Sequence, residues 1–332
     1  MNPIQPITAR PREISVAEPV SPALERVKLM LFQPFDLGKW FVIGFCAWLA
    51  CLGEGGGGGG GGNFGNNFGN HSHETGAEVR HGLEQAWGYV LNHLYWIVPV
   101  ASLLILLCLA LGLLILWLNC RGKFMFLHCV ALNQAEVVEP WNKFGREGNS
   151  LFWFRVVLGL IGAVLTLPLL ATIAVLILRM IFRGEPDVGG IVMAAGLALV
   201  FFVLAIVFAI LRKFTVDFVV PIMFLRGGKC WAAWKEFYGL LSAHPGQFAL
   251  YILFQIVLSM AIGVLVLLAI LVTCCVAGCL MALPYLGTVL LLPVLIFKRA
   301  YPLYYLAQYG PEYDVFPPPA TPPMAGTSPL PA

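Results

Sequence analysis

Hydrophobic residues gather in long runs along this sequence, separated by shorter segments that hold basic, aromatic and proline residues. A helix that crosses a membrane needs about 20 mainly apolar residues, because it spans about 30 Å of hydrocarbon at 1.5 Å per residue. Six runs come close to that length, and the last two are only a few residues apart. They predict six membrane-spanning helices, the last two joined as a hairpin: residues 37–53, 94–118, 151–180, 188–211, 248–272 and 275–297.

The overall composition agrees with this pattern. Of the 332 residues, 59% are hydrophobic and 11% are charged, and the mean hydropathy is +0.84. Soluble proteins average about 45–50% apolar and about 25% charged residues. The few charges here cannot cover an ordinary solvated surface, so the composition excludes a soluble enzyme, a nucleic-acid-binding module and a disordered chain. It predicts an integral, multi-pass membrane protein that binds no nucleic acid.

Basic residues are distributed unevenly between the two sides of the predicted spans. Of the 20 Lys and Arg residues, all but Arg80, Arg179 and Arg183 fall in segments on one side. Cytoplasmic segments of membrane proteins are enriched in Lys and Arg. The distribution therefore predicts that both termini are cytoplasmic.

The chain divides into three parts. Residues 1–35 form a polar N-terminal segment, in which Ser21 is the expected N-cap of a short amphipathic helix from Pro22 to Phe32. Residues 36–310 form the six-span membrane domain, and the Pro-rich residues 311–332 are expected to be a disordered cytoplasmic tail. The external loop of residues 54–92 contains eight consecutive glycines, which favour a flexible tether.

Neither histidines nor cysteines indicate a metal site. The external loop holds His71, His73 and His81 beside Glu74 and Glu78, but on a flexible loop solvated side chains are favoured over a metal site. The nine cysteines are an odd number and lie mostly in or beside spans, so no disulfide framework is expected.

A two-span unit recurs in the sequence. Trp141 and Phe144 stand between the second and third spans, and Trp234 and Phe237 stand at the same spacing 93 residues later, between the fourth and fifth spans. Both pairs fall in cytoplasmic connections, so the units share one orientation and are not inverted. The pattern predicts three parallel two-span repeats with interfacial elbow helices on the inner face.

The connecting helix after Gly228 has an aromatic face. On a helical wheel, an arc of about 120° collects Trp231, Trp234, Phe237, Tyr238 and Leu241. Such a face is typical of a helix that lies at the membrane interface. A docking surface for a cytoplasmic protein partner is the alternative.

One stretch of the chain resembles a known group of proteins. It runs from Asp217 through Pro221 and the pair Gly227-Gly228 to Trp234, and Phe248 then opens a span. It is similar to the cytoplasmic elbow of a broad bacterial group that includes membrane domains attached to some glycerophosphodiester phosphodiesterases. The resemblance covers about residues 24–310 and implies a bacterial cytoplasmic (inner) membrane. The chain has no soluble region large enough for the phosphodiesterase domain, so no catalytic residue is implied.

Ionisable residues are missing from the centres of the six predicted spans. A charge there costs about 2.5–3.5 kcal/mol and usually marks function, so an ion-coupled transporter or proton pump is disfavoured. Asp217 is the best single candidate for chemistry. Lys213 lies one turn earlier, and an ion pair between them at the headgroup level is the favoured interpretation. Gln255 and Ser259, four residues apart on the fifth span, favour an interhelical hydrogen bond over a substrate contact.

No set of nucleophile and base, no metal motif and no cofactor motif is visible in the sequence. The leading hypothesis is a non-enzymatic membrane scaffold or accessory subunit, which presents its elbows and Pro-rich tail to a protein partner or to lipid. The alternative is a transporter or permease for an apolar or lipid-like solute. Neither a cofactor nor a metal is expected, and the sequence predicts no oligomeric state.

Overall fold

The computed structural model of the chain describes residues 14–54, 93–183, 188–273, 278, 281 and 283–316. Over these residues the regular secondary structure is helical, and they contain no strand. The prediction of an all-α protein is confirmed. The glycine run, the loop histidines and most of the Pro-rich tail lie outside the described residues.

Four helices are long and apolar enough to cross a membrane. They contain the second to the fifth predicted spans: α4 (Leu94–Leu132), α6 (Gly145–Arg183), α7 (Val188–Phe214) and α10 (Pro245–Val272). Helix α7 continues through a π-helical turn, η2 (Thr215–Val219), into α8 (Val220–Arg226). Large aliphatic side chains along the four helices are exposed. Apolar surface of this extent marks contact with a membrane, so the helices are consistent with a membrane protein.

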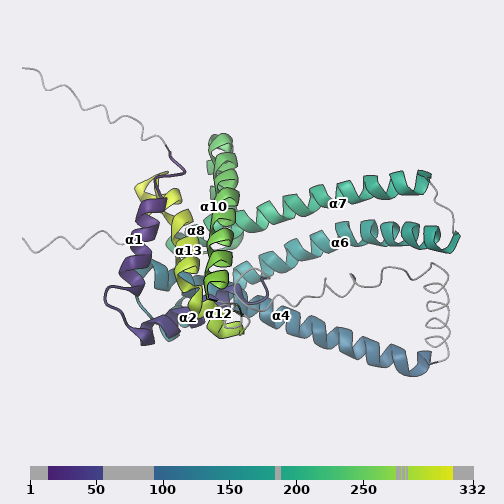
Figure 1. Cartoon of the computed structure of the whole chain (residues 1–332), viewed down its shortest axis with the longest axis horizontal. Helices are drawn as coiled ribbons and strands as arrows, with labels where there is room; N and C mark the ends of the chain where they lie inside the picture. Colours follow the sequence, from purple (N-terminus) through teal and green to yellow (C-terminus); the bar gives the residue numbers. More distant parts are fainter. Residues whose placement is uncertain are drawn as a thin grey trace, which may run out of the picture.

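The four long helices do not form one bundle. Figure 1 shows α4, α6 and α7 extending in a common direction from a packed region, whereas α10 runs across that direction. Helix α6 packs against both α4 and α7. Helix α10 instead uses its N-terminal part to pack on α9 (Cys230–Ala243) and α13 (Leu292–Ala307). The structure therefore differs here from the single bundle that the sequence predicts.

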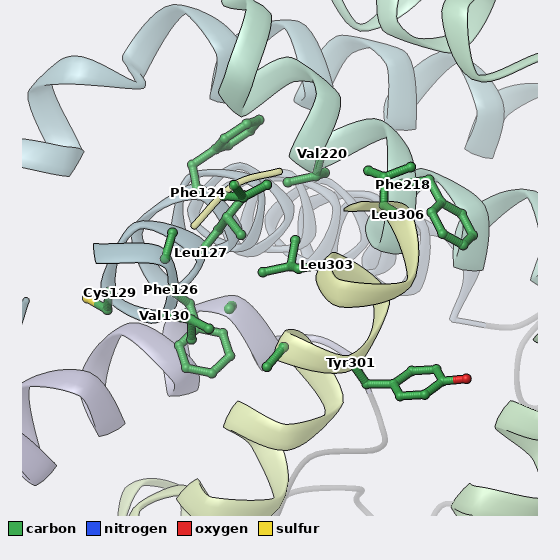
Figure 2. Close-up of a cluster of buried hydrophobic side chains, with 14 of the residues drawn as sticks. Phe124, Phe126, Leu127, Cys129, Val130, Phe218, Val220, Tyr301, Leu303 and Leu306 are labelled. Carbon is green, nitrogen blue, oxygen red and sulfur yellow. The ribbon is translucent and has the colours of Figure 1, made fainter. Parts of the chain in front are cut away.

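The packed region surrounds the C-terminal half of α4. Besides α9 and α13 it contains α1 (Val20–Leu31), α2 (Leu37–Cys51), α5 (Val138–Lys143), α12 (Pro284–Leu290) and the short η3 (Pro311–Tyr313). Figure 2 shows its core, where Phe124, Leu127 and Val130 of α4 meet Leu303 and Leu306 of α13. These side chains are fully or almost fully buried. Helix α1 lies where the sequence predicts the amphipathic helix, and it begins two residues before Pro22.

The first predicted span is a 15-residue helix, α2, which is about 22 Å long and too short to cross a bilayer on its own. It packs antiparallel to the C-terminal half of α4. Lys39 Nζ donates to Asn133 Oδ1 at 2.9 Å at one end, and Glu54 pairs with Lys123 at the other. The sequence predicts that Glu54 and Lys123 lie on opposite sides of the membrane, whereas the structure brings their side chains into contact. The close approach depends on Gly122, where a Cβ would lie 2.6 Å from the backbone of α2.

The last predicted span is divided. Proline stands in the first turn of both α12 and α13, where its fixed backbone angle begins a new helix. Helix α12 packs on α2, and Tyr285 there donates its hydroxyl hydrogen to the Phe41 carbonyl at 2.9 Å. Helix α13 packs on α1. The two ends of the described chain meet here, since Ser15 N donates to Gln308 Oε1 at 2.8 Å.

Candidate functional site

A carboxylate shared by three basic side chains lies where α4, α6 and α7 leave the packed region. One oxygen of Glu54, which follows α2, is 2.6 Å from Lys123 Nζ, 2.9 Å from Arg155 Nη2 and 3.4 Å from Arg212 Nη2. Lys123 comes from α4, Arg155 from α6 and Arg212 from α7. A single acidic residue therefore joins the three helices that extend in the same direction.

Asn119 positions this cluster. It lies one turn before Lys123 on α4, so both side chains share a face of the helix. Its amide nitrogen donates to the carbonyls of Ala50 and Leu52 at 2.6 and 2.9 Å, which satisfies carbonyl groups at the C-terminal end of α2 that have no partner within the helix. Its oxygen accepts from Arg155 Nη1 at 2.6 Å. A left-handed turn at Gly53, with φ of +76°, then directs Glu54 back toward the basic residues.

Charge in the cluster is not balanced. Lys123 and Arg155 are almost fully buried, and three cations face one carboxylate. Burial disfavours the charged form of Glu54, but Lys123 and Arg155 more than offset this and lower its pKa to about 2. The carboxylate stays ionised, and Arg155 and Arg212 together carry more positive charge than it neutralises. The side chain of Arg212 is 56% exposed and is free to contact a further anion.

A pocket of about 790 Å³ opens beside the cluster, between α4, α6 and α7. Glu54, Asn119, Arg155 and Arg212 form its end nearest the packed region, and the remaining lining is mainly apolar. Three glycines on the helices, Gly112, Gly159 and Gly162, leave room in the walls, and an added Cβ at Gly159 would meet nothing within 4 Å. We refer to this space as the cationic pocket. Its size is in the range of small-molecule sites, and its chemistry fits a molecule with an apolar body and an acidic end.

Asp217, the best candidate from the sequence, lies in a second cluster. Its Oδ2 accepts from Lys213 Nζ and from the Tyr251 hydroxyl, each at 2.8 Å. The predicted pairing with Lys213 is confirmed, but Asp217 is buried in the π-helical turn and does not form a surface ion pair. Gln255 bonds to the Tyr251 hydroxyl on its own helix at 3.1 Å. Ser259, one turn further along α10, is exposed and does not join this network.

Arg299 of α13 stands between the two clusters. It is 7% exposed, and its Nη1 donates to the Val216 carbonyl at 2.8 Å. Its Nε and Nη2 have no hydrogen-bond partner among the residues that the structure describes. Burial lowers the pKa of Arg299 to about 10, while Asp217 and Glu54 favour its charged form. Arg299 adds to the excess of positive charge in this part of the molecule.

The predicted aromatic residues have different surroundings. Phe144 stacks on Phe224 with ring centroids 4.8 Å apart, and Phe237 stacks on Phe218 at 5.1 Å, so both members of the repeated pattern belong to the core. The Arg121 guanidinium lies 4.7 Å from the Trp141 ring.

Helix α9 does not bury its aromatic face as a unit. Trp234 is half-buried and stacks on Phe154, with ring centroids 6.0 Å apart. Trp231 and Tyr238 are exposed, whereas Phe237 is fully buried. The face that the sequence groups together is therefore split between the core and the surface.

Comparison with known proteins gives one match. Residues 14–292, most of the chain, match DUF7544, a family of unknown function. The chain belongs to the DUF7544 family. No curated protein and no solved structure matches this DUF7544 chain. In the described part of the chain, no group of three or more His, Cys, Asp or Glu side chains is arranged to hold a metal ion.

Sequence reasoning missed the cationic pocket of this DUF7544 protein. Glu54, Arg155 and Arg212 each stand at the end of an apolar run, where contact with water is the ordinary interpretation. The available signal was Asn119 with Lys123, two polar residues one turn apart just after a span. That spacing shows a polar helix face, but it does not show which side chains from other helices meet it.

Proposed function

We propose that this protein is a non-enzymatic membrane protein that binds an acidic, lipid-like solute in the cationic pocket. The acidic group would lie against Arg212 and Arg155, and the apolar body would lie along α4, α6 and α7. The observation that carries the proposal is the excess of basic side chains at one end of an otherwise apolar pocket. Charge-assisted hydrogen bonds from Arg to a carboxylate or phosphate are strong, and they strengthen in surroundings of low dielectric.

This proposal favours the second of the two hypotheses from the sequence. A scaffold presents surfaces to a partner, and the elbow residues Phe144 and Phe237 are buried in the core and do not form such a surface. A carrier or permease for a lipid-like solute needs an opening between helices, and the pocket supplies one. We therefore place solute binding first and keep the accessory-subunit role as the second candidate, since the exposed part of α9 is available to a partner.

The membrane topology is part of the proposal. We propose that α4, α6 and α7 cross the bilayer with their basic ends at the cytoplasmic face of a bacterial inner membrane, as the excess of Lys and Arg there favours. The contact between Ser15 and Gln308 supports placing both termini on the same side. The order of long helix, elbow helix and long helix occurs twice, in α4–α5–α6 and in α7–α9–α10, which supports a repeated unit in the chain, although α10 runs across α7 rather than beside it. Helix α2 then lies on the cytoplasmic side with Glu54.

The proposal is tested by lipid binding to the purified full-length protein. Dioleoyl phosphatidic acid and dioleoylglycerol share an apolar body and differ in the phosphate. We expect phosphatidic acid to bind at least about tenfold more tightly, and Arg212→Gln to remove most of that difference. Because Arg212 is exposed, this substitution leaves the packed region intact.

A pair of glycine substitutions distinguishes lipid binding in the pocket from lipid binding elsewhere on the surface. Gly159→Leu adds a side chain to the pocket at a position where a Cβ meets nothing within 4 Å, and we expect it to weaken binding of both lipids. Gly196→Leu on α7 is the matched control, because a Cβ there also meets nothing within 4 Å and Gly196 does not line the pocket. Equal binding of the two lipids by the unmodified protein, or unchanged binding by Gly159→Leu, would overturn the proposal.

A further inference from the structure

A second groove lies on the other side of α6. It runs between the first turns of α6 and the helix α9, has a volume of about 910 Å³ and is separate from the cationic pocket. Leu158 of α6 contributes to both linings, so this helix stands between the two spaces. We refer to the second space as the α6/α9 groove.

Helical periodicity explains the two walls of the groove. Trp153, Val157 and Ile161 follow one another at intervals of four residues along α6, and all three line the groove. Trp231, Lys235 and Tyr238 lie on one face of α9 at intervals of four and three residues and form the opposite wall. The hydrogen bond from Cys230 N to Ser150 Oγ, 2.9 Å long, fixes α9 against α6 at the base.

The walls combine exposed aromatic rings with free positive charge. Trp153 is 65% exposed, Trp231 75% and Tyr238 65%, which is unusual for rings of this size in contact with water alone. Lys229 and Lys235 are exposed and form no ion pair with any other described residue. Glu236, the one acidic neighbour on α9, is already paired with Arg226 at 3.0 Å.

The groove lies at the boundary between apolar and charged surface. Toward one end its lining continues into the exposed aliphatic side chains of α6, such as Val157 and Ile161. Lys229, in the turn before α9, and Lys235 of α9 also line the groove and bring positive charge to it. Tryptophan and tyrosine concentrate at this level of a membrane, where one end of the side chain is apolar and the other wet.

We infer that the α6/α9 groove binds an anionic phospholipid of the cytoplasmic leaflet. The phosphate and acidic headgroup lie against Lys229 and Lys235, the glycerol region lies between Trp153 and Trp231, and an acyl chain follows α6. Charge complementarity selects this occupant, because each Lys near an anionic membrane surface contributes about 1 kcal/mol of attraction and the groove holds no free acidic residue among those described. The site is independent of the solute proposed for the cationic pocket.

Quenching of tryptophan fluorescence tests the inference on the full-length protein in detergent micelles. Dibrominated phosphatidylglycerol and dibrominated phosphatidylcholine are added in turn. We expect half-maximal quenching by phosphatidylglycerol at a roughly thirtyfold lower mole fraction, since the attraction of two lysines converts to about that factor. The double variant Lys229→Gln, Lys235→Gln should lose this preference, and the double variant Trp153→Phe, Trp231→Phe should lose most of the quenched signal.

Matched variants keep the result specific. Lys28→Gln with Arg146→Gln removes two other exposed basic residues outside the groove and should retain the preference. Both residues also lie outside the cationic pocket, so a failure of the cationic pocket proposal leaves this test intact. Equal quenching by the two lipids in the unmodified protein, or a preference that survives loss of Lys229 and Lys235, would overturn the inference. An aromatic and basic face used only by a protein partner would give the first of these results.

Discussion

Two acidic residues, Glu54 and Asp217, lie within the same charged part of the molecule and differ in what surrounds them. Asp217 is buried and its contacts are a single lysine and a tyrosine hydroxyl, so its charge is matched and enclosed. Glu54 contacts three cations, and the space beside it is open. The contrast supports our proposal that the Glu54 cluster binds an anion, because there one sign of charge is in excess and the excess faces an opening.

The largest expected effect is the labelling of residues near Glu54 from one side of the membrane only. The contrast between Glu54 and Asp217 holds only if both residues lie on the same side. Single cysteines at Leu52, Asn142 and Val188 are introduced after accessible native cysteines are replaced by serine. A membrane-impermeant maleimide should label Leu52→Cys from the same side as Asn142→Cys, and Val188→Cys from the opposite side. Labelling of Leu52→Cys from the same side as Val188→Cys would show that residues 37–53 cross the membrane as the sequence predicts. Glu54 and Asp217 would then lie on opposite sides.

Removal of each carboxylate gives the next largest effect. Glu54→Gln leaves three cations together, two of them buried, and should cost about 3 kcal/mol of stability. Asp217→Asn should cost less, because Tyr251 can still donate to the amide oxygen and the Lys213 side chain is 44% exposed. Apparent melting temperatures in detergent compare the two variants. Glu54→Gln should also tighten phosphatidic acid binding, and an unchanged affinity would count against the cationic pocket.

The stability that Glu54 contributes should depend on pH. The pKa of Glu54 is lowered from 4.5 to about 2 in the folded protein, so its ionised form stabilises the fold. This contribution, about 3 kcal/mol, is complete above pH 4.5 and is lost as the pH falls toward 2. The difference in melting temperature between the unmodified protein and Glu54→Gln should therefore shrink between pH 4.5 and pH 2. A difference that stays constant over this range would show that the carboxylate does not act through its charge.

The sequence predicts the long helices and the local ion pair, but it does not predict how the helices are arranged. Long runs without charge predict α4, α6, α7 and α10 correctly, because their length and composition are set by local sequence. The arrangement of the helices depends on contacts between distant residues, such as Gly122 of α4 with the backbone of α2. The pairing of Lys213 with Asp217 was predictable because the two residues lie one helical turn apart. Glu54 and Arg155 form an ion pair although they are 101 positions apart, and no local sequence pattern predicts this contact.

The smallest expected effect isolates the hydrogen bonds of the enclosed cluster. Tyr251→Phe keeps the ring that packs on Phe218 and Tyr305 and removes only the hydroxyl that links Asp217 with Gln255. The expected loss is about 1–2 kcal/mol, since a hydrogen bond to a charged group is removed and Gln255 loses its acceptor. Melting temperature should fall by a few degrees, while phosphatidic acid binding should not change. A loss of lipid binding with intact stability would mean that the Asp217 cluster belongs to the solute site, and the separation between the two clusters would then be wrong.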